Sequence, residues 1–457
     1  MYETTINPGI GLGSFLKLGS SLYSVSNALM KFNYKLRIGY SDKDFLNLSI
    51  IVEVVDVGIR LTFLNHHHQA LNLIELMHLN DSKSKPIKLI YNDINLNELD
   101  TNESNEFKKS DEMKKLNEVD NKRLFTDLDG KRTSPDQLSS FLFTGPTLKS
   151  IYNKIFGPTY PGDLYDHVYL ITYPGISFKF KLSSEIYDKV RHLQKQAIIL
   201  YLLNLDQDII CDSIAIHKGD SWNDFKNSDR NLCENHEPIN RLSINLDVGE
   251  IIVNFNDSST KKLIIGKTSQ QQTLNILGPP DNYFNKFDSR LLIHKHTNIK
   301  YDNEISQYKF HNYFKYGFDI LYDLNDESNL VQNKTTIKKV IIHNGGIPES
   351  LNFMKWNRCN WEIYNKLVNF NSSMVFDNLP SYLKSLSPVI LNRNESEFVD
   401  NDLDIIDYPK VNQESVASTN PMEQKIKTWG QSKLYGFDHC IFEILDSNGT
   451  ISTITVY

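Results

Sequence analysis

The stretch Gly317-Phe318-Asp319-Ile320-Leu321-Tyr322 decides the fold, because the rest of the chain repeats its pattern. Apolar residues alternate along it, as they do in a strand that lays one face on a hydrophobic core. The glycine in front allows a turn with positive φ, or a close approach of another backbone segment. We therefore predict a strand that begins directly after Gly317.

The same pattern occurs in three more places: Gly58-Ile59-Arg60-Leu61-Thr62-Phe63, Gly175-Ile176-Ser177-Phe178-Lys179-Phe180 and, less regularly, Gly436-Phe437-Asp438-His439-Cys440-Ile441-Phe442. We expect Gly58, Gly175, Gly317 and Gly436 to occupy equivalent positions. Each glycine strand is followed by a second apolar strand, at 71–74, 214–217, 340–343 and 451–456.

A short helical pattern precedes each glycine strand. Leu22, Val25 and Leu29 recur at spacings of three and four, which place them on one face of a helix. Ser20 or Ser21 and Thr147 are suitable N-caps, because their hydroxyls can accept a bond from a free backbone N–H. The unit is therefore a helix followed by antiparallel strands.

This order predicts an α+β fold of four divergent helix-plus-antiparallel-strand repeat units that form sheet-rich layers. Long polar loops are inserted between and within them. The predicted parts are unit 1 at 1–91, a polar insertion at 92–137, unit 2 at 138–260 with an extra helical stretch at 187–203, unit 3 at 261–365, and unit 4 at 366–457 with a polar insertion at 392–424.

Three segments have too few apolar residues for their burial to offset the entropy that is lost when a segment becomes ordered. Asn92 to Asp136 and Asn392 to Gln424 are rich in Asn, Asp, Glu and Ser, and a shorter polar stretch runs from Asp323 to Thr336. We expect these segments to be loose loops.

The bulk composition excludes several classes of protein. The 457 residues carry 49 basic and 56 acidic side chains, a net charge of −7, which argues against an overall surface for nucleic acid. The longest apolar run, Ala197 to Leu203, is far shorter than the ~20 residues of a membrane span. With no signal peptide in sight and four widely spaced cysteines, the sequence predicts a cytoplasmic protein with reduced thiols.

The motifs that resemble functional sites have simpler structural interpretations. Gly9-Ile10-Gly11-Leu12-Gly13 follows no strand that could make it a phosphate loop, so we interpret it as a flexible lead-in. His66-His67-His68 falls in an expected hairpin loop, and consecutive residues of a strand cannot all face one metal ion. We expect no metal site and no cofactor site.

Catalytic signals are absent from the sequence as well. No nucleophile elbow, reactive-cysteine motif or His-Glu-x-x-His motif is present. Asp319, Asp323 and Asp438 are expected on the polar outer faces of strands. The aromatic run from Tyr308 to Tyr316 is expected in a strand core, with a partner surface as the alternative. We predict a non-enzymatic protein with no catalytic residues.

An ordered series of segments resembles the phagophore assembly factor family. It includes Gly19-Ser20-Ser21-Leu22, Tyr173-Pro174-Gly175-Ile176-Ser177-Phe178, Gly266 to Gly278, Tyr313 to Asp323 with Lys338 to Asn344, Phe376-Asp377-Asn378-Leu379, and Tyr435-Gly436-Phe437 to Val456. The long polar insertions depart from the family pattern, as does Ser387 where members often have glycine.

The resemblance implies a scaffold in autophagy or membrane trafficking. Family members pair with a WD-repeat β-propeller protein and associate with forming autophagosomes at preautophagosomal structures, and some lie at the Golgi. The implied membrane association is peripheral and goes through the partner. Two alternatives stay open: a lipid- or small-ligand-binding module, and a hydrolase or transferase.

Overall fold

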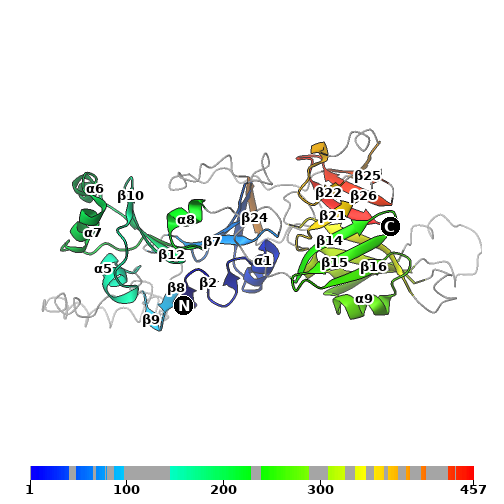
Figure 1. Ribbon diagram of the computed structural model, residues 1–457, viewed down its shortest axis with the longest axis horizontal. Coiled ribbons are helices and arrows are strands. Elements are labelled where there is room, and N and C mark those ends of the chain that lie inside the picture. Colours follow the sequence, from blue (N-terminus) through cyan, green and yellow to red (C-terminus); the bar gives the residue numbers. More distant parts are fainter. Residues whose placement is uncertain are drawn as a thin grey trace, which may run out of the picture.

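The elements of the chain fall into an N-terminal half and a C-terminal half, which lie side by side along the long axis of the molecule (Figure 1). The computed structural model describes residues 2–40, 48–64, 68–77, 79, 87–96, 145–227, 238–287, 307–324, 335–345, 355–364, 369–378, 387–391, 403–407, 431–437 and 439–457.

The N-terminal half is built on a nine-stranded sheet. Its order is β10-β11-β12-β13-β7-β6-β5-β4-β24, and the two meanders β4 to β7 and β10 to β13 meet where β13 pairs antiparallel with β7. The strands are β4 (Leu36–Tyr40), β5 (Ile50–Val54), β6 (Ile59–Phe63), β7 (Leu71–Leu76), β10 (Asp163–Tyr165), β11 (Val168–Tyr173), β12 (Ile176–Lys181), β13 (Ser213–Ile216) and β24 (Leu403–Asp407).

The C-terminal half is built on an eight-stranded sheet of the same kind. Its order is β17-β18-β19-β20-β27-β26-β25-β23, and its two meanders meet where β20 pairs antiparallel with β27. The strands are β17 (Asn282–Phe287), β18 (Gln307–Tyr313), β19 (Phe318–Asp323), β20 (Ile337–His343), β23 (Val389–Leu391), β25 (Ser432–Phe437), β26 (Cys440–Leu445) and β27 (Ile451–Val456).

Each half adds a smaller five-stranded sheet. In both, the first strand of a three-stranded meander pairs in parallel with a later strand: β1 with β8, and β14 with β21. The strands are β1 (Tyr2–Asn7), β2 (Gly11–Leu12), β3 (Leu16–Lys17), β8 (Ile87–Tyr91), β9 (Ile94–Asn95), β14 (Ile239–Asn245), β15 (Glu250–Phe255), β16 (Thr260–Ile264), β21 (Trp361–Tyr364) and β22 (Asn369–Asn371).

The helices begin where the sequence places their caps. Ser21, Thr147 and Ser269 each cap a helix with the side-chain oxygen, which confirms the predicted caps Ser21 and Thr147. The helical elements are α1 (Leu22–Lys31), α5 (Leu148–Ser150), η1 (Ile151–Ile155), α6 (Ser184–Val190), α7 (Lys195–Leu203), α8 (Trp222–Asn227), α9 (Gln270–Leu277), η2 (Phe314–Tyr316) and η3 (Phe376–Asn378). The extra helical stretch predicted at 187–203 is thus two helices, α6 and α7.

The residues that precede α1, α5, α9 and η3 are each joined by a bridge to a residue one to three positions before the closing strand of a meander. Isolated bridges join Ser21 to Ala70, Thr147 to Ile210, Ser269 to Thr336 and Val375 to Thr450. The protein is therefore a sheet-rich α+β protein.

Three of the four predicted glycines lie in the turn before a strand, with positive φ: Gly58 (67°), Gly175 (78°) and Gly317 (79°). Their carbonyls accept bonds from the N–H groups of Met77, His217 and His343, just at or past the end of the closing strands. These glycines meet both conditions that the sequence suggested, a positive φ and an entering strand.

Gly436 is different, and the predicted strand from Gly436 to Phe442 is wrong. Gly436 lies inside β25, and the chain turns before β26 begins at Cys440. At the other three places the glycine carbonyl accepts a bond from the end of the closing strand. Here the carbonyl of His439 takes that role, and it accepts from the N–H of Tyr457 at 3.0 Å. Apolar residues lie on both sides of the turn, so the apolar pattern continues through it and does not indicate where the turn lies.

The predicted insertions contain ordered elements at two places. Ile94–Asn95 form β9, and Leu96 beyond it is buried. Leu403–Asp407 form β24, which pairs with β4 of the N-terminal half. Both are short apolar groups within polar surroundings, which a composition average misses. The rest of the two long insertions, 97–136, 392–402 and 408–424, lies outside the described residues, as do residues 325–334 of the shorter one.

The glycine-rich N-terminal segment is not a flexible lead-in. Leu12 is buried in β2, and the backbone N–H of Gly9 donates to the carbonyl of Gly175 at 3.0 Å. Its glycines allow the backbone to lie against the turn before β12. Each half has one hydrophobic core, and the two cores draw on residues 6–216 and 239–456 respectively.

Candidate functional site

The second face of the nine-stranded sheet, opposite the core, carries a row of charged side chains. Glu53 stands in register with both Arg37 and Arg60, at distances of 3.6 Å and 3.1 Å between charged atoms. Arg60 stands opposite Glu75, whose carboxylate accepts a 2.7 Å bond from Lys179 on the other meander. Opposite charges placed directly across strands stabilise their pairing, so this row ties the two meanders together.

A serine–histidine pair lies beside this row. Ser177 Oγ is 2.7 Å from His217 Nε2, and His217 Nδ1 is 3.1 Å from the carbonyl oxygen of Lys218. Burial lowers the pKa of His217, so the ring is neutral at pH 7. Since a carbonyl only accepts, we infer that Nδ1 carries the proton and that Nε2 accepts from the Ser177 hydroxyl.

This pair bears on the question of catalysis. The sequence predicted no nucleophile beside a base in a cleft, and Ser177 is a serine beside a base. Both side chains are 0% exposed, and the rings of Trp222 and Phe225 in α8 pack on His217. A substrate has no route to the hydroxyl in this conformation, so the visible effect of the pair is to hold α8 against the sheet.

An aspartate–histidine pair occupies the matching place in the C-terminal half. Asp319 Oδ2 lies 2.8 Å from His343 Nε2, and Oδ1 accepts from Asn312 at 2.7 Å and from the Trp356 indole at 2.9 Å. The His343 ring stacks on Trp356 with 4.2 Å between ring centres. Asp319 is only 5% exposed, so the expected polar outer face is wrong for this residue.

The two pairs are equivalent by register. Thr172 stands opposite Ser177 between β11 and β12, as Asn312 stands opposite Asp319 between β18 and β19. In both halves the histidine follows or ends the closing strand, and a tryptophan from the segment after it covers the ring. Each pair therefore fixes the segment that returns across the second face of its sheet.

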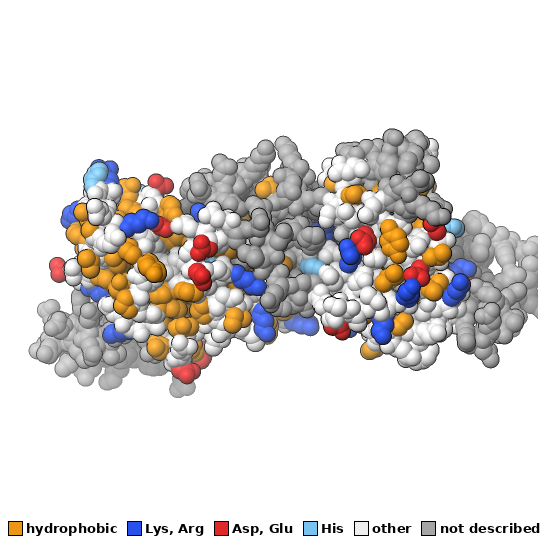
Figure 2. Space-filling model, viewed as in Figure 1, with side chains coloured by type: hydrophobic (Ala, Val, Ile, Leu, Met, Phe, Trp, Pro, Cys, Tyr) orange, Lys and Arg blue, Asp and Glu red, His pale blue; other side chains and the backbone are white. Residues whose placement is uncertain are grey.

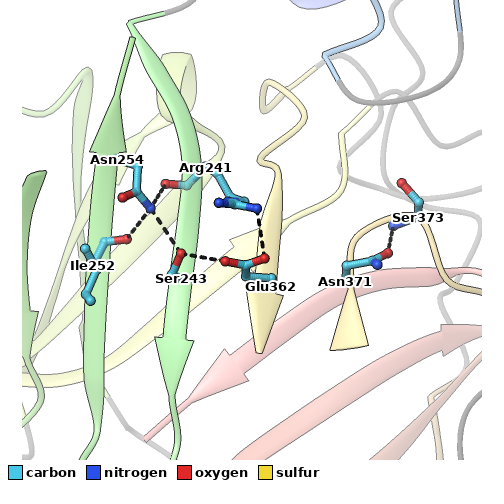
Figure 3. Close-up of polar contacts among 7 residues, drawn as sticks. All are labelled: Arg241, Ser243, Ile252, Asn254, Glu362, Asn371 and Ser373. Atoms are coloured by element: carbon cyan, nitrogen blue, oxygen red, sulfur yellow. Dashed lines mark hydrogen bonds and ion pairs between the residues drawn. The ribbon is translucent and has the colours of Figure 1, made fainter. Parts of the chain in front are cut away.

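A third polar network crosses the five-stranded sheet of the C-terminal half (Figure 3). Glu362 of β21 accepts from Arg241 and from Ser243, both at 2.9 Å, and Asn254 of β15 donates to Ser243 at 3.1 Å. The same strands are joined in parallel at β14 and β21. The network therefore supports the parallel pairing on which this sheet depends.

His311 makes the stability of the C-terminal half depend on pH. Its Nε2 lies 2.9 Å from Gln270 Nε2, its buried Nδ1 has no hydrogen-bond partner among the described residues, and burial lowers its pKa to about 4. The folded state thus favours the neutral ring, a contribution that is present above pH ~6.5 and is lost as the pH falls toward 4.

We expect the free energy of unfolding to fall by about 2 kcal/mol between pH 7 and pH 5 because of His311. The measurement is urea denaturation of the wild type and of His311→Asn at both pH values. The variant, which cannot titrate at this position, should show a correspondingly smaller fall. An equal fall in both proteins would contradict the assignment.

The N-terminal half also carries apolar side chains on three neighbouring segments, Ile10, Tyr91 with Ile94, and Phe156 with Tyr160 four residues further along the chain, and we call this set the Tyr91 surface. Tyr91 stands opposite Ile94 and stacks on Phe156 with 4.3 Å between ring centres. Ile10, Ile94 and Tyr160 are 60%, 43% and 91% exposed. Hydrophobic side chains gather over this half in Figure 2.

A cleft of about 390 Å³ adjoins this surface. It lies between the turn after β1 and the β8–β9 hairpin, and Ile10 and Tyr91 line it together with polar residues such as Asn92 and Asp93. Large exposed apolar side chains beside a cleft are typical of a binding surface rather than of a solvated face.

The remaining sequence features have structural places. His68 Nε2 lies 3.0 Å from Asn360 Nδ2 of the other half, while His66 and His67 lie outside the described residues. The side chains of Cys211, Cys359 and Cys440 are buried. Tyr313 of the aromatic run is a core residue, as predicted. Asp438 and Cys233 are not among the described residues.

Within the described part of the chain, no group of three or more His, Cys, Asp or Glu residues is placed to hold a metal ion. None of the described helices combines the length and the apolar composition needed to cross a membrane.

The fold and these surfaces define a two-part, sheet-rich α+β protein with buried polar pairs and exposed apolar side chains. Residues 138–457 match the model of the family described as Phagosome assembly factor 1 (PHAF1). The chain belongs to this family, which confirms the resemblance seen in the sequence.

Two relatives agree with this membership. A PHAF1 protein of Arabidopsis thaliana is 23% identical over 475 residues, which cover 99% of this chain and 92% of the relative. A PHAF1 protein of Drosophila melanogaster is 22% identical over 342 residues, which cover 68% of this chain and 71% of the relative. No solved structure matches the chain.

Proposed function

We propose that this chain is a non-catalytic scaffold in phagosome or autophagosome assembly, and that it acts by binding a WD-repeat β-propeller protein. The name of the family supports the process. The observation that carries a binding role is the Tyr91 surface, where Ile10 lines a cleft and Ile94 and Tyr160 are exposed.

The four-unit architecture belongs to the same proposal. The recurring bridge before α1, α5, α9 and η3 and the recurring bond at the end of the closing strands support four units of common design. On this basis the units are structural modules that pair into two large sheets, and Gly58, Gly175 and Gly317 are structural residues of their turns. The scaffold works on the cytoplasmic side of membranes, at preautophagosomal structures or at the Golgi, and reaches them through its partner.

The Tyr91 surface gives the proposal its test. A variant with Ile10→Ser, Ile94→Ser and Tyr160→Ser should lose at least ~10-fold in affinity for a purified WD-repeat propeller protein from the same cells, because buried aromatic and aliphatic anchors carry most of an interface's energy. Titration calorimetry with the purified propeller protein measures this.

The matched control is Leu200→Ser on α7, which is 61% exposed and lies outside the Tyr91 surface. Both variants should keep the wild-type melting temperature, and the control should keep wild-type affinity. A triple variant that binds the propeller as well as the wild type would remove the Tyr91 surface from the proposal. If the wild type bound no WD-repeat propeller protein, the proposed partner would be wrong.

The alternative of a lipid- or small-ligand-binding module rests on the cleft beside Ile10. It predicts saturable binding of a fluorescent fatty acid that is weakened by Ile10→Ser. The scaffold proposal predicts no such binding, so the same variants separate the two functions.

A further inference from the structure

Strand β24 joins the two halves of the molecule. Its neighbours along the chain, β23 and β25, belong to the eight-stranded sheet, but β24 itself lies on the edge of the nine-stranded sheet (Figure 1). All five of its residues pair with β4, from Leu403 opposite Leu36 to Asp407 opposite Tyr40. Residues 403–407 therefore leave their own half and complete the sheet of the other.

The strand has the character of an added ligand rather than of a part of the sheet. The other eight strands of this sheet form two meanders, as do the eight strands of the C-terminal sheet, where β17 stands at the end in the place that β4 has here. The β4–β24 pair is parallel, whereas every other described pair in the two large sheets is antiparallel. Addition of an extended segment to a free sheet edge is a common mode of peptide recognition.

The edge strand also offers a specific chemistry. Leu36, Ile38 and Tyr40 of β4 are buried, and Arg37 between them is the end of the charged row on the second face. Among the residues whose side chains the structure describes, none hydrogen-bonds to the buried Nε of Arg37. The position opposite Arg37 in the ladder is Asp404. An acidic residue at this position extends the alternation of opposite charges across the sheet.

We propose that the β4 edge is a binding site for an extended apolar–acidic segment that adds in parallel, and that residues 403–407 of the same chain are its occupant. The backbone ladder supplies affinity, and the register position opposite Arg37 is the place where an acidic residue is required.

The test uses the full chain with residues 403–407 replaced by a glycine–serine pentapeptide, and a fluorescent peptide of residues 400–410 as the probe. This open-edge variant should bind the peptide saturably, at least ~10-fold more tightly than the wild type, because the tethered strand competes at high effective concentration. Fluorescence anisotropy measures both affinities.

Two controls address the ladder and the charge. A peptide with Ile405→Pro loses a ladder donor and should not bind. Arg37→Glu in the open-edge variant should weaken binding at least ~5-fold, whereas Arg241→Glu, in the ion pair on the five-stranded sheet, should leave it unchanged. No binding by a folded open-edge variant, or equal binding by the wild type, overturns the proposal.

A cysteine pair tests whether the occupant comes from the same chain. Ile38→Cys with Ile405→Cys, which stand opposite each other, should give an intramolecular disulfide and a monomer on a non-reducing gel. A disulfide-linked dimer would show that β24 comes from a second copy, and would overturn the assignment within one chain.

Discussion

Replacing Asp319 with alanine is expected to destabilise the C-terminal half by about 4 kcal/mol, the cost of removing one partner from a buried pair. The change leaves His343, Asn312 and the Trp356 indole without their shared acceptor in a buried place. Each unsatisfied buried donor adds its own desolvation cost. Urea denaturation followed by tryptophan fluorescence measures the loss, because the Trp356 ring contacts the pair directly.

The matched variant is Asp319→Asn. Its amide oxygen can still accept from Asn312 and Trp356, so only the charge-assisted bond to His343 is lost, and the expected cost is about 2 kcal/mol. Equal losses in the two variants would mean that the charge, and not the number of satisfied donors, decides the stability of this cluster. If Asp319→Ala lost less stability than Asp319→Asn, the result would contradict the buried network.

Gly175→Ala should cost about 3 kcal/mol, which combines the penalty for a side chain at positive φ with an overpacking term. Gly175 has φ +78°, and an added Cβ would lie 2.1 Å from the backbone nitrogen of Gly9. Backbone on both sides leaves no flexible side chain to move away. Hydrogen exchange of β12 and urea denaturation both report the change.

Two other glycines separate these contributions. Gly449 has φ +68° with no atom within 4 Å of an added Cβ, so Gly449→Ala should cost only about 1 kcal/mol. Gly436 has neither a positive φ nor a close neighbour, and Gly436→Ala should change the stability by less than ~0.5 kcal/mol. If Gly175→Ala costs no more than Gly449→Ala, the contact with Gly9 has no energetic weight.

The sequence predicted the parts of the fold that have a local signal. The strands after Gly58, Gly175 and Gly317 were found because alternation of apolar residues and a glycine with positive φ both lie within six residues. The helix caps were found for the same reason. The coarse class, a sheet-rich α+β protein, follows from these elements alone.

The features that were missed depend on pairing between distant residues. Residues 403–407 are a short segment in a polar stretch, and their partner β4 is far away in the sequence. The average composition of that stretch therefore predicted a loop. Asp319 has the spacing of a solvent-facing strand position, but the segment that carries Trp356 returns over it. No local pattern contains that information, because the cover comes from another part of the chain.

The Tyr91 surface was not predicted from the sequence either. Ile10, Ile94 and Tyr160 come from three segments, and each taken singly is an ordinary apolar residue of a turn, a short strand and a loop. Only the fold brings the segments together at Tyr91 and Phe156. A signal in the sequence exists for Tyr160 alone, which stands between two prolines in Pro158-Thr159-Tyr160-Pro161.

The pairing of β20 with β27 has a consequence for synthesis of the protein. Val340 in the middle of the eight-stranded sheet pairs with Val456, so the sheet cannot close until the ribosome has released more than a hundred further residues. Until then the apolar strand β20 has an unpaired edge that is open to solvent. Contacts so distant in sequence slow folding, and an unpaired strand of this kind is a site for aggregation or for a chaperone. The central strands β7 and β13 of the N-terminal half are synthesised early. This half can therefore form all of its large sheet except β24 before β27 has been synthesised.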